Sequence, residues 1–276
     1  MWHGTVRSLP FAQQLRATAL AGCEAMSMTP YAYGQLRESG RAARDILRQA
    51  ADEGVALFHL DPLIRWIEPW KPDLPPEAFP YELLSTTCDA FLEMARDLEA
   101  ESITAWGAFP AGSLPRAAII DAFGALCDRA AQNGLYCDME FLPMYGVPTL
   151  EEAWAIIDAV GRPNARLVFD LWHYFRGKRD DALLATIPGE KIGSVQICDA
   201  TAAPPPGVPL GLDGQTARRL PGEGEFAITE ALDILAKTGG LRTVGYEIFS
   251  TAFDTMDAAM IAKAVKTSMD AILAPY

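Results

Sequence analysis

The sequence is poor in positive charge and in histidine. It contains 36 Asp and Glu against 23 Lys and Arg, so the formal net charge at pH 7 is −13, and it has only three histidines. Proteins that bind a nucleic-acid backbone displace its counterions with clustered Lys and Arg, and no long Lys/Arg run is present. Three histidines are also few for a zinc cluster of the kind that repair endonucleases use. We therefore expect no nucleic-acid partner.

Long apolar runs and paired cysteines are missing as well. No stretch approaches the roughly 20 apolar residues of a membrane span, and the start MWHGTVRSLP lacks a basic segment followed by an apolar one. The five cysteines form no CxxC pair and are odd in number, which favours reduced thiols over disulfides or a zinc site. We expect a cytoplasmic protein with no membrane partner.

The motifs of several large enzyme classes are absent too. GxGxxG, GxxxxGK[ST] and GxSxG do not occur, so neither a nucleotide-phosphate cradle nor a serine nucleophile elbow has support. A doubly wound sheet would be expected to carry a glycine-rich turn after its first strand. These absences count against a doubly wound sheet and favour the other common α/β architecture, the (β/α)8 barrel.

Short apolar runs alternate with amphipathic segments along the whole chain. The runs predict eight strands, near residues 2–8, 23–28, 55–60, 102–109, 135–141, 167–170, 192–199 and 243–249. Helices are predicted over residues 9–21, 33–53, 81–99, 114–132, 149–160, 180–186, 228–237 and 256–273. No linker or change of composition divides this alternation. It predicts an α/β protein with one domain over residues 1–276, a single (β/α)8 TIM barrel.

One connection of the predicted barrel is unusually long. Residues 61–80 are crowded with proline and carry Trp66 and Trp70. A loop of that length inside a compact domain is typical of a lid or binding segment.

Oxygen-donating side chains recur near the carboxyl ends of four consecutive predicted strands. They are Glu140, Asp170, Gln196 and Glu247. One acid alone would more simply be a solvated loop residue or the partner of an arginine. A set of three carboxylates and one amide on neighbouring barrel strands instead suits a hard divalent cation such as Mn²⁺ or Mg²⁺. A cation would also relieve the mutual repulsion of the three acids.

Four further residues are candidates for substrate contact or catalysis. His173 follows the strand that ends at Asp170, which favours a working histidine over a packed one. His59, at the end of a predicted strand, is a substrate contact or a base, or it packs in the core. Arg219 offers a planar fork of donors for a hydroxyl, carboxylate or phosphate, or it forms a surface ion pair. Trp106 belongs to aromatic residues near strand ends that line a pocket or the core.

Five segments of the second half resemble a known family. They are MEFLP (139–143), VFDLWHYFR (168–176), SVQICDA (194–200), RRLPGEGE (218–225) and GYEIFS (245–250). In these segments the chain resembles the xylose isomerase-like TIM-barrel family of sugar isomerases and epimerases, which includes D-tagatose 3-epimerase, inosose dehydratase and 3-dehydroshikimate dehydratase. The first half matches only in its rhythm of strands and helices.

The resemblance implies roles for the residues at matching positions. Glu140, Asp170, Gln196 and Glu247 would hold a divalent cation, commonly Mn²⁺, Mg²⁺ or Co²⁺. Glu140 and Glu247 would double as the acid/base pair, and His173 would contact a substrate oxygen. The chain departs from many epimerases at Gln196, where histidine is usual. Glutamine there is similar to what dehydratase members carry, so the departure bears on the type of reaction.

The expected function is a metal-dependent isomerase or epimerase that acts on a keto sugar or related polyol through an enediolate. A cation that grips a ketone and an adjacent hydroxyl stabilises the enediolate charge, and a carboxylate can then remove the proton between them. Loss of a β-hydroxyl after the same first step gives dehydration, so the alternative is a lyase of a cyclic hydroxy-ketone, similar to 3-dehydroshikimate dehydratase. A barrel kept only as a subunit or sensor is a third reading. The partner is then a small-molecule substrate, and family members are often dimers or tetramers.

Overall fold

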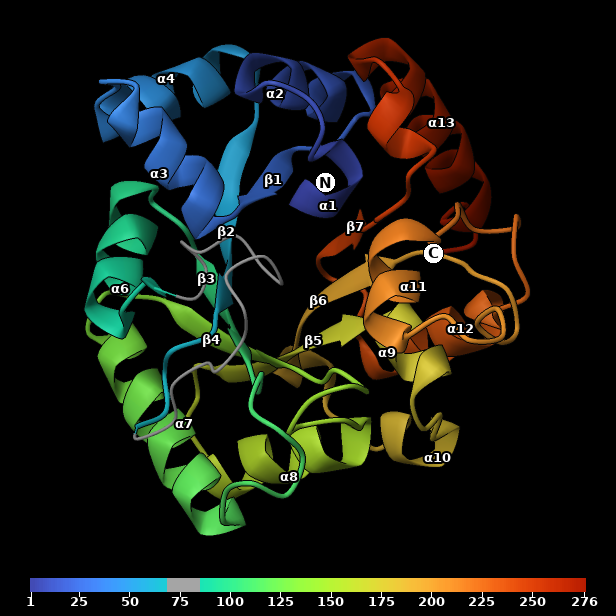
Figure 1. Ribbon diagram of the computed structural model, residues 1–276. Coiled ribbons are helices and arrows are strands. Elements are labelled where there is room, and N and C mark those ends of the chain that lie inside the picture. The colour runs from blue at the N-terminus through green and yellow to red at the C-terminus, as the bar shows by residue number, and fades with distance from the viewer. Residues whose placement is uncertain (69–84) are drawn as a thin grey trace. The chain divides into compact units, whose positions relative to one another are not determined.

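Seven strands lie next to one another in the order in which the chain forms them (Figure 1). A computed structural model of the chain describes residues 1–68 and 85–276. The strands are β1 (Ala25–Met28), β2 (Ala56–Leu63), β3 (Ser102–Trp106), β4 (Tyr136–Glu140), β5 (Ala165–Asp170), β6 (Ile192–Ile197) and β7 (Val244–Tyr246). Four pairs of neighbouring strands are hydrogen-bonded in parallel: β2 with β3, β3 with β4, β4 with β5, and β6 with β7. This order and direction are typical of a strand–helix repeat.

Helices fill the connections between the strands. They are α1 (His3–Val6), α2 (Phe11–Leu20), α3 (Pro30–Glu38), α4 (Ala43–Asp52), α6 (Cys88–Asp97), α7 (Arg116–Ala131), α8 (Leu150–Val160), α9 (Leu171–Arg176), α10 (Asp181–Leu184), α11 (Leu210–Thr216), α12 (Ile228–Thr238) and α13 (Ala258–Ile272). Their ends follow local chemistry. The Thr149 side chain caps α8 by accepting from the Glu152 N–H, and Gly161 ends it with a positive φ of 61°.

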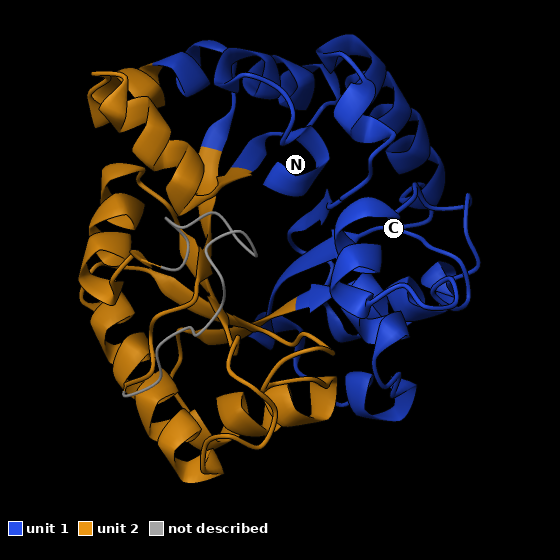
Figure 2. Cartoon of the chain, in the orientation of Figure 1, with its two compact units in different colours: residues 1–26, 49–56, 169–276 blue, residues 27–48, 57–168 orange. Residues whose placement is uncertain are grey.

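The chain divides into two compact units (Figure 2). Unit 1 comprises residues 1–26, 49–56 and 169–276 and contains β6, β7 and α9–α13. Unit 2 comprises residues 27–48 and 57–168 and contains β3, β4 and α6–α8. The boundaries fall inside β1, α4, β2 and β5. A single domain over residues 1–276 stays a prediction.

The first predicted strand is wrong. Residues 2–8 hold the short helix α1, so the described residues contain seven strands where the sequence predicted eight. Main chain and side chain both connect this segment to β7, and the Trp2 N–H donates to the Tyr246 carbonyl at 3.0 Å. The Thr5 hydroxyl donates to the Tyr246 carbonyl at 2.9 Å and accepts from the Ile248 N–H at 2.9 Å. One threonine thereby satisfies main-chain groups that an eighth strand would have paired.

Three other predicted elements need correction. The helix over residues 33–53 is two helices, α3 and α4, separated at Gly40, whose φ of +87° does not fit a helix. Of the helix predicted over residues 81–99, the described part is interrupted at residues 86–87 and continues as α6 from Cys88, which Thr87 caps; residues 81–84 lie outside the described residues. The loop predicted to begin at residue 61 starts later because β2 runs to Leu63. Its residues 69–80, with Trp70, also lie outside the described part.

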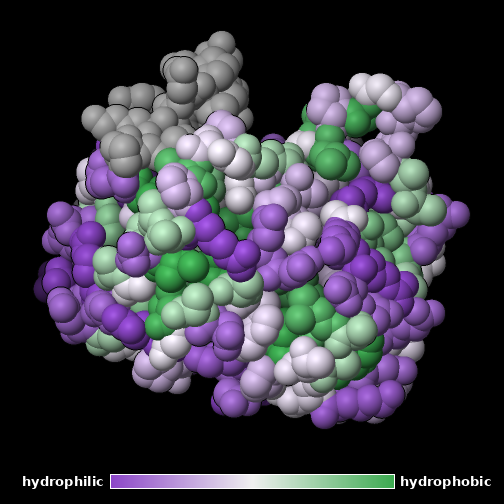
Figure 3. All heavy atoms as spheres, turned by 90° about the horizontal axis from the view of Figure 1, so that it is seen from below, coloured by the Kyte–Doolittle hydropathy of each residue, from purple (hydrophilic) through white to green (hydrophobic). Residues whose placement is uncertain are grey.

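The face of the molecule drawn in Figure 3 is mainly polar. Hydrophilic side chains predominate on the face drawn in Figure 3, and hydrophobic ones show in separate patches. Among residues 1–68 and 85–276, no helix has both the length and the apolar character that crossing a bilayer requires. All five cysteines are free thiols, as predicted.

Candidate functional site

Strand register determines where the first two candidate ligands lie. Glu140 is the last residue of β4 and pairs with Val168 of β5, two residues before Asp170. Asp170 ends β5 and caps α9, with its Oδ1 accepting a 2.9 Å hydrogen bond from the His173 N–H. The cap starts a helix where the sequence suggested only a strand end, and the first turn of that helix carries His173.

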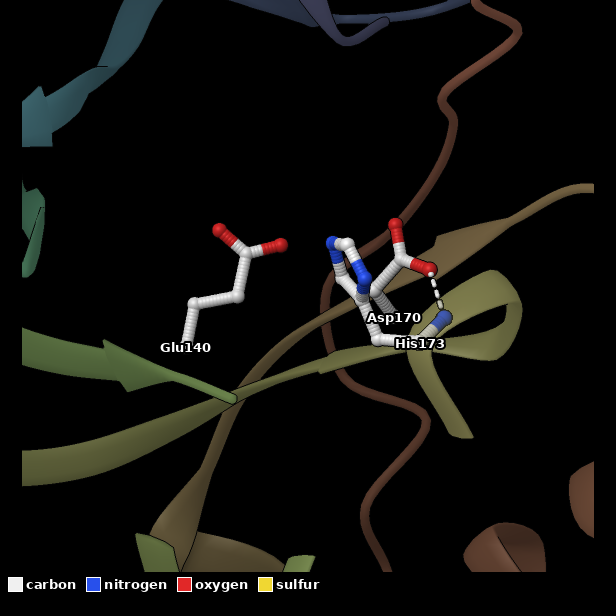
Figure 4. A group of neighbouring side chains, drawn as sticks. All are labelled: Glu140, Asp170 and His173. Atoms are coloured by element: carbon white, nitrogen blue, oxygen red, sulfur yellow. Dashed lines mark hydrogen bonds between the residues drawn. The ribbon is translucent and has the colours of Figure 1, made fainter. Parts of the chain in front are cut away.

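Glu140, Asp170 and His173 form a group of buried neighbours (Figure 4). Each offers one potential ligand atom, and these atoms lie within 4.8 Å of one another. Figure 4 also shows the hydrogen bond that the His173 backbone N–H donates to the Asp170 carboxylate. Two carboxylates and an imidazole nitrogen are ligands that Mn²⁺ and Zn²⁺ both accept.

The other two predicted ligands meet at the ends of β6 and β7. Gln196 pairs with Gly245 in the sheet, and Glu247 directly follows β7. The Gln196 Nε2 donates to the Glu247 Oε1 at 3.0 Å, and both side chains are buried. The Gln196 Oε1 is buried without a hydrogen-bond partner among the described residues. A buried acceptor of this kind needs a donor or a cation.

Arg218 is the residue that the sequence prediction missed. Its guanidinium Nη1 lies 2.7 Å from the Asp170 Oδ2 and 2.9 Å from the Glu247 Oε2, with side-chain exposures of 3%, 0% and 5% for the three residues. Its Nε donates to the Gly214 carbonyl at 2.9 Å. Arg218 therefore bridges two of the predicted ligands inside unit 1.

Alternation along the chain could have revealed this arginine. The segment around Arg219 is extended and forms an antiparallel bridge with Asp199. Successive side chains of an extended segment point to opposite sides. Leu220 and Arg218 are both buried, whereas Arg219 is exposed. The apolar Leu220 was the signal that the inward arginine is Arg218.

The electrostatics of the group depend on this arginine. Burial alone would raise the pKa of Asp170, but the charges of Arg218 and His173 outweigh it and hold that pKa below its ordinary value. The pKa of Arg218 is raised because its carboxylate partners outweigh the effect of burial, so the guanidinium stays charged. With His173 neutral, as a metal ligand must be, three carboxylates at positions 140, 170 and 247 and one guanidinium leave two negative charges, which one divalent cation balances. The residues present thus fit such an ion in charge, in donor type and in the unsatisfied Gln196 oxygen.

Trp106 contacts one of the candidate ligands directly. Its indole N–H donates to the Glu140 Oε2. Its backbone carbonyl in turn accepts a 2.7 Å hydrogen bond from the indole of Trp66. Trp66 is buried and packs edge-on against Phe109 and Phe123. Part of the predicted aromatic loop therefore supports the residue that holds Glu140.

His59 and Arg219 have other partners. The two ring nitrogens of His59 lie within hydrogen-bond distance of the hydroxyls of Ser102 and Thr104, and the residue is 2% exposed. Burial, and secondarily the charge of Arg166, lowers the pKa of His59 to about 3. Arg219 is exposed and donates to the Glu223 carbonyl at 2.9 Å. These contacts favour packing for His59 and a surface role for Arg219, and their contacts with substrate stay predictions.

Comparison with known proteins identifies the family. The family model described as a xylose isomerase-like TIM barrel matches residues 15–272. The chain belongs to the xylose isomerase-like TIM-barrel family. The match covers nearly the whole chain, including the first half, where the sequence showed only a rhythm of strands and helices. It confirms the predicted fold class and the family resemblance.

Two curated relatives of this xylose isomerase-like chain are enzymes. Inosose isomerase of Bacillus velezensis is 29% identical over 153 residues, or 55% of this chain and 53% of the relative. 3-Dehydroshikimate dehydratase of Pseudomonas aeruginosa is 30% identical over 143 residues, or 50% of this chain and 21% of the relative. The matched part is therefore about half of the first relative and about a fifth of the second.

A solved structure agrees with the fold over the full chain. The crystal structure of the IolI protein with a binding zinc atom superposes with a TM-score of 0.82 at 18% identity. The match covers 100% of this xylose isomerase-like chain and 98% of IolI. At that identity the likeness shows the fold.

Proposed function

We propose that the protein is a divalent-metal-dependent isomerase or epimerase that acts on a keto sugar or related polyol through an enediolate. The observation that carries the proposal is the buried group of Glu140, Asp170 and His173, whose ligand atoms lie within 4.8 Å of one another. Buried acids are costly unless they are paired or bind a cation. The inosose isomerase relative supports a polyol-derived ketone as the substrate class.

The proposed cation is Mn²⁺, Mg²⁺ or Co²⁺, held by Glu140, Asp170, Gln196 and Glu247. Bound there, it would polarise a substrate ketone and stabilise the negative charge that develops on proton loss. The Gln196 Oε1, buried without a partner among the described residues, supports its place in this set. His173, in the same group as Glu140, is proposed to hydrogen-bond a substrate oxygen.

Proton transfer is assigned to Glu140 and Glu247. The Trp106 indole orients one oxygen of Glu140. Gln196 and Arg218 each hold one oxygen of Glu247. A carboxylate fixed in this way removes the carbon-bound proton without first reorganising its surroundings. Return of the proton to the opposite face of the same carbon gives epimerisation, and return to the next carbon gives isomerisation.

A dehydratase is the second candidate. Gln196 stands where many epimerases of the family carry histidine, and a 3-dehydroshikimate dehydratase is among the relatives. Loss of a β-hydroxyl from the same enediolate would give a conjugated product. This reading shares every proposed ligand with the first and differs only in the fate of the intermediate.

Metal content and isotope exchange test the proposal. Purified protein is expected to contain about one divalent ion per chain, and Mn²⁺ is expected to raise the Tm over a chelated control. A panel with keto sugars, an inosose and 3-dehydroshikimate is then incubated in deuterated water. Deuterium uptake without loss of water indicates the isomerase, and a new conjugated absorbance indicates the dehydratase. No bound ion and no Tm response would refute the metal-dependent function.

Matched variants test the assigned roles. Glu140→Gln and Glu247→Gln keep the shape of each side chain and are expected to abolish turnover while the folded state survives. Full activity in either variant would refute its role in proton transfer. His59→Gln and Arg219→Gln test substrate binding, and an unchanged KM would assign both residues to the structure alone.

The setting of this activity is also a proposal. We propose a cytoplasmic enzyme whose partner is its small-molecule substrate, with neither nucleic acid nor membrane as a binding partner. The net charge of −13 supports the exclusion of nucleic acid. A dimer or tetramer is proposed by analogy with the family, and light scattering of the purified protein measures it.

A further inference from the structure

Asp199 lies two residues after β6 and is only 1% exposed. Its carboxylate accepts four backbone N–H groups. The Oδ1 accepts from Ala200 at 2.8 Å and from Phe226 at 3.0 Å, and the Oδ2 accepts from Gly222 and Gly224 at 3.0 Å each. Three of the four donors belong to one turn, residues 220–226, far along the chain from Asp199. The turn is therefore built around a single buried carboxylate.

The backbone of this turn fits closely around the carboxylate. A Cβ atom at Gly224 would lie 2.3 Å from the Asp199 Oδ1 and 2.3 Å from the Ala200 carbonyl oxygen. Asp199 and Arg219 also exchange two main-chain hydrogen bonds of 2.8 Å. Main chain and side chain of Asp199 thus fix the same segment at several points.

The segment that Asp199 fixes delivers Arg218. Because Arg219 pairs with Asp199 in an extended geometry, the preceding side chain points to the opposite side of the segment. On that side the Arg218 guanidinium reaches Asp170 and Glu247. A shift of the turn would therefore move the one cation that contacts both carboxylates in the described part of the site.

We propose that Asp199 is a positioning residue for the candidate site, and that its carboxylate determines where Arg218 lies. Two anionic oxygens can accept all four N–H groups, whereas an asparagine would place an NH₂ donor against backbone donors. This role differs from that of a residue that only stabilises a loop, because Asp199 would affect catalysis through the position of Arg218. This catalytic consequence rests on the proposed function, but the placement of Arg218 does not.

The first measurement follows hydrogen exchange at the Arg218 side chain and needs no assay of activity. In protein labelled with ¹⁵N-arginine, the Nε–H of Arg218 is assigned by its loss in Arg218→Lys. Its bond to the Gly214 carbonyl protects it from exchange with water. Asp199→Asn is expected to speed that exchange by about tenfold or more, which corresponds to a loss of about 1.4 kcal/mol. Gly224→Ala, which perturbs the turn from its other side, is expected to act in the same direction and serves if Asp199→Asn does not fold.

Asn164→Ala is the matched structural control. Asn164 also ties distant backbone segments together, by donating to the Cys127 and Leu135 carbonyls at 2.8 and 3.1 Å, but it belongs to unit 2, whereas Arg218 belongs to unit 1. It is expected to lower the Tm without changing the Arg218 exchange rate. Unchanged Arg218 exchange in Asp199→Asn or in Gly224→Ala would overturn the proposal.

The second measurement is a double-mutant cycle on kcat. If Asp199 acts through Arg218, Asp199→Asn lowers kcat in the wild type and has no further effect in Arg218→Lys. Additive losses would overturn the proposal, because they would mean that Asp199 acts independently of Arg218. An inactive wild type would refute the proposed function, and the exchange measurement would still decide the placement of Arg218.

Discussion

Replacement of Arg218 by methionine is the most informative perturbation of the site. The substitution keeps an unbranched apolar stem like the aliphatic part of arginine but removes the charge that lies 2.7 Å from Asp170 and 2.9 Å from Glu247. Both carboxylates are then left buried without this partner. Breaking a buried ion pair by removing one member typically destabilises a protein by about 3–5 kcal/mol.

The expected change is large enough to measure by thermal unfolding in EDTA. For a chain of this size, a loss of about 4 kcal/mol corresponds to a Tm lower by about 10 °C. Arg219→Met is the matched control, because the neighbouring arginine is exposed and donates a hydrogen bond to the Glu223 backbone carbonyl. Its effect is expected to stay within about 0.5 kcal/mol.

Manganese then separates a metal site from an ordinary ion-pair network. With Arg218 gone, the site has one more uncompensated negative charge, so Mn²⁺ is expected to raise the Tm of Arg218→Met more than that of the wild type. Equal Tm values for the wild type and Arg218→Met in EDTA would refute the reasoning about the buried carboxylates. A larger metal response in the wild type would refute the charge balance.

Two further predictions concern unit 2. Burial, and secondarily the charge of Arg166, lowers the pKa of His59 to about 3 in the folded chain. In the unfolded chain this histidine has its ordinary pKa of about 6.5. Between these two pH values, His59 is therefore protonated mainly in the unfolded chain. The free energy of unfolding therefore falls as the pH drops from about 6.5 toward 3, by up to about 1.4 kcal/mol per pH unit. His59→Gln is expected to reduce this pH dependence, which urea unfolding at pH 7 and 4.5 measures. An equal pH dependence in His59→Gln and the wild type would contradict the lowered pKa of His59. Trp106→Phe removes the indole N–H that orients Glu140, together with part of the ring, and is expected to lower kcat by about tenfold, whereas an unchanged kcat would leave the indole without a role.

The strand–helix alternation was sufficient to predict the fold class. Buried strands such as β5 and β6 are apolar runs bounded by turn signals, so the periodicity of the sequence locates them. The error at residues 2–8 has a specific cause. Trp2 and Val6 occupy alternate positions as in a strand, but Thr5 hydrogen-bonds main-chain groups of Tyr246 and Ile248, which no local pattern shows.

The candidate ligands could be predicted because they follow strands, whereas Arg218 could not be predicted in the same way. Glu140 and Asp170 end β4 and β5, so their placement follows from strand register. Arg218 lies in an extended loop whose path depends on the hydrogen bonds of Asp199 with distant residues. Sequence reasoning selected the neighbouring Arg219, because the side of the chain on which each arginine lies is a tertiary property.

The central claim is that Glu140, Asp170, Gln196 and Glu247 hold one divalent cation. Crystals grown with Mn²⁺ and measured at the manganese absorption edge test it most directly. We expect a single strong anomalous peak within coordination distance of Glu140 and Asp170, and we expect this peak to disappear in Glu140→Gln. A fully ordered site with no anomalous peak, or a peak bound elsewhere on the chain, would contradict it.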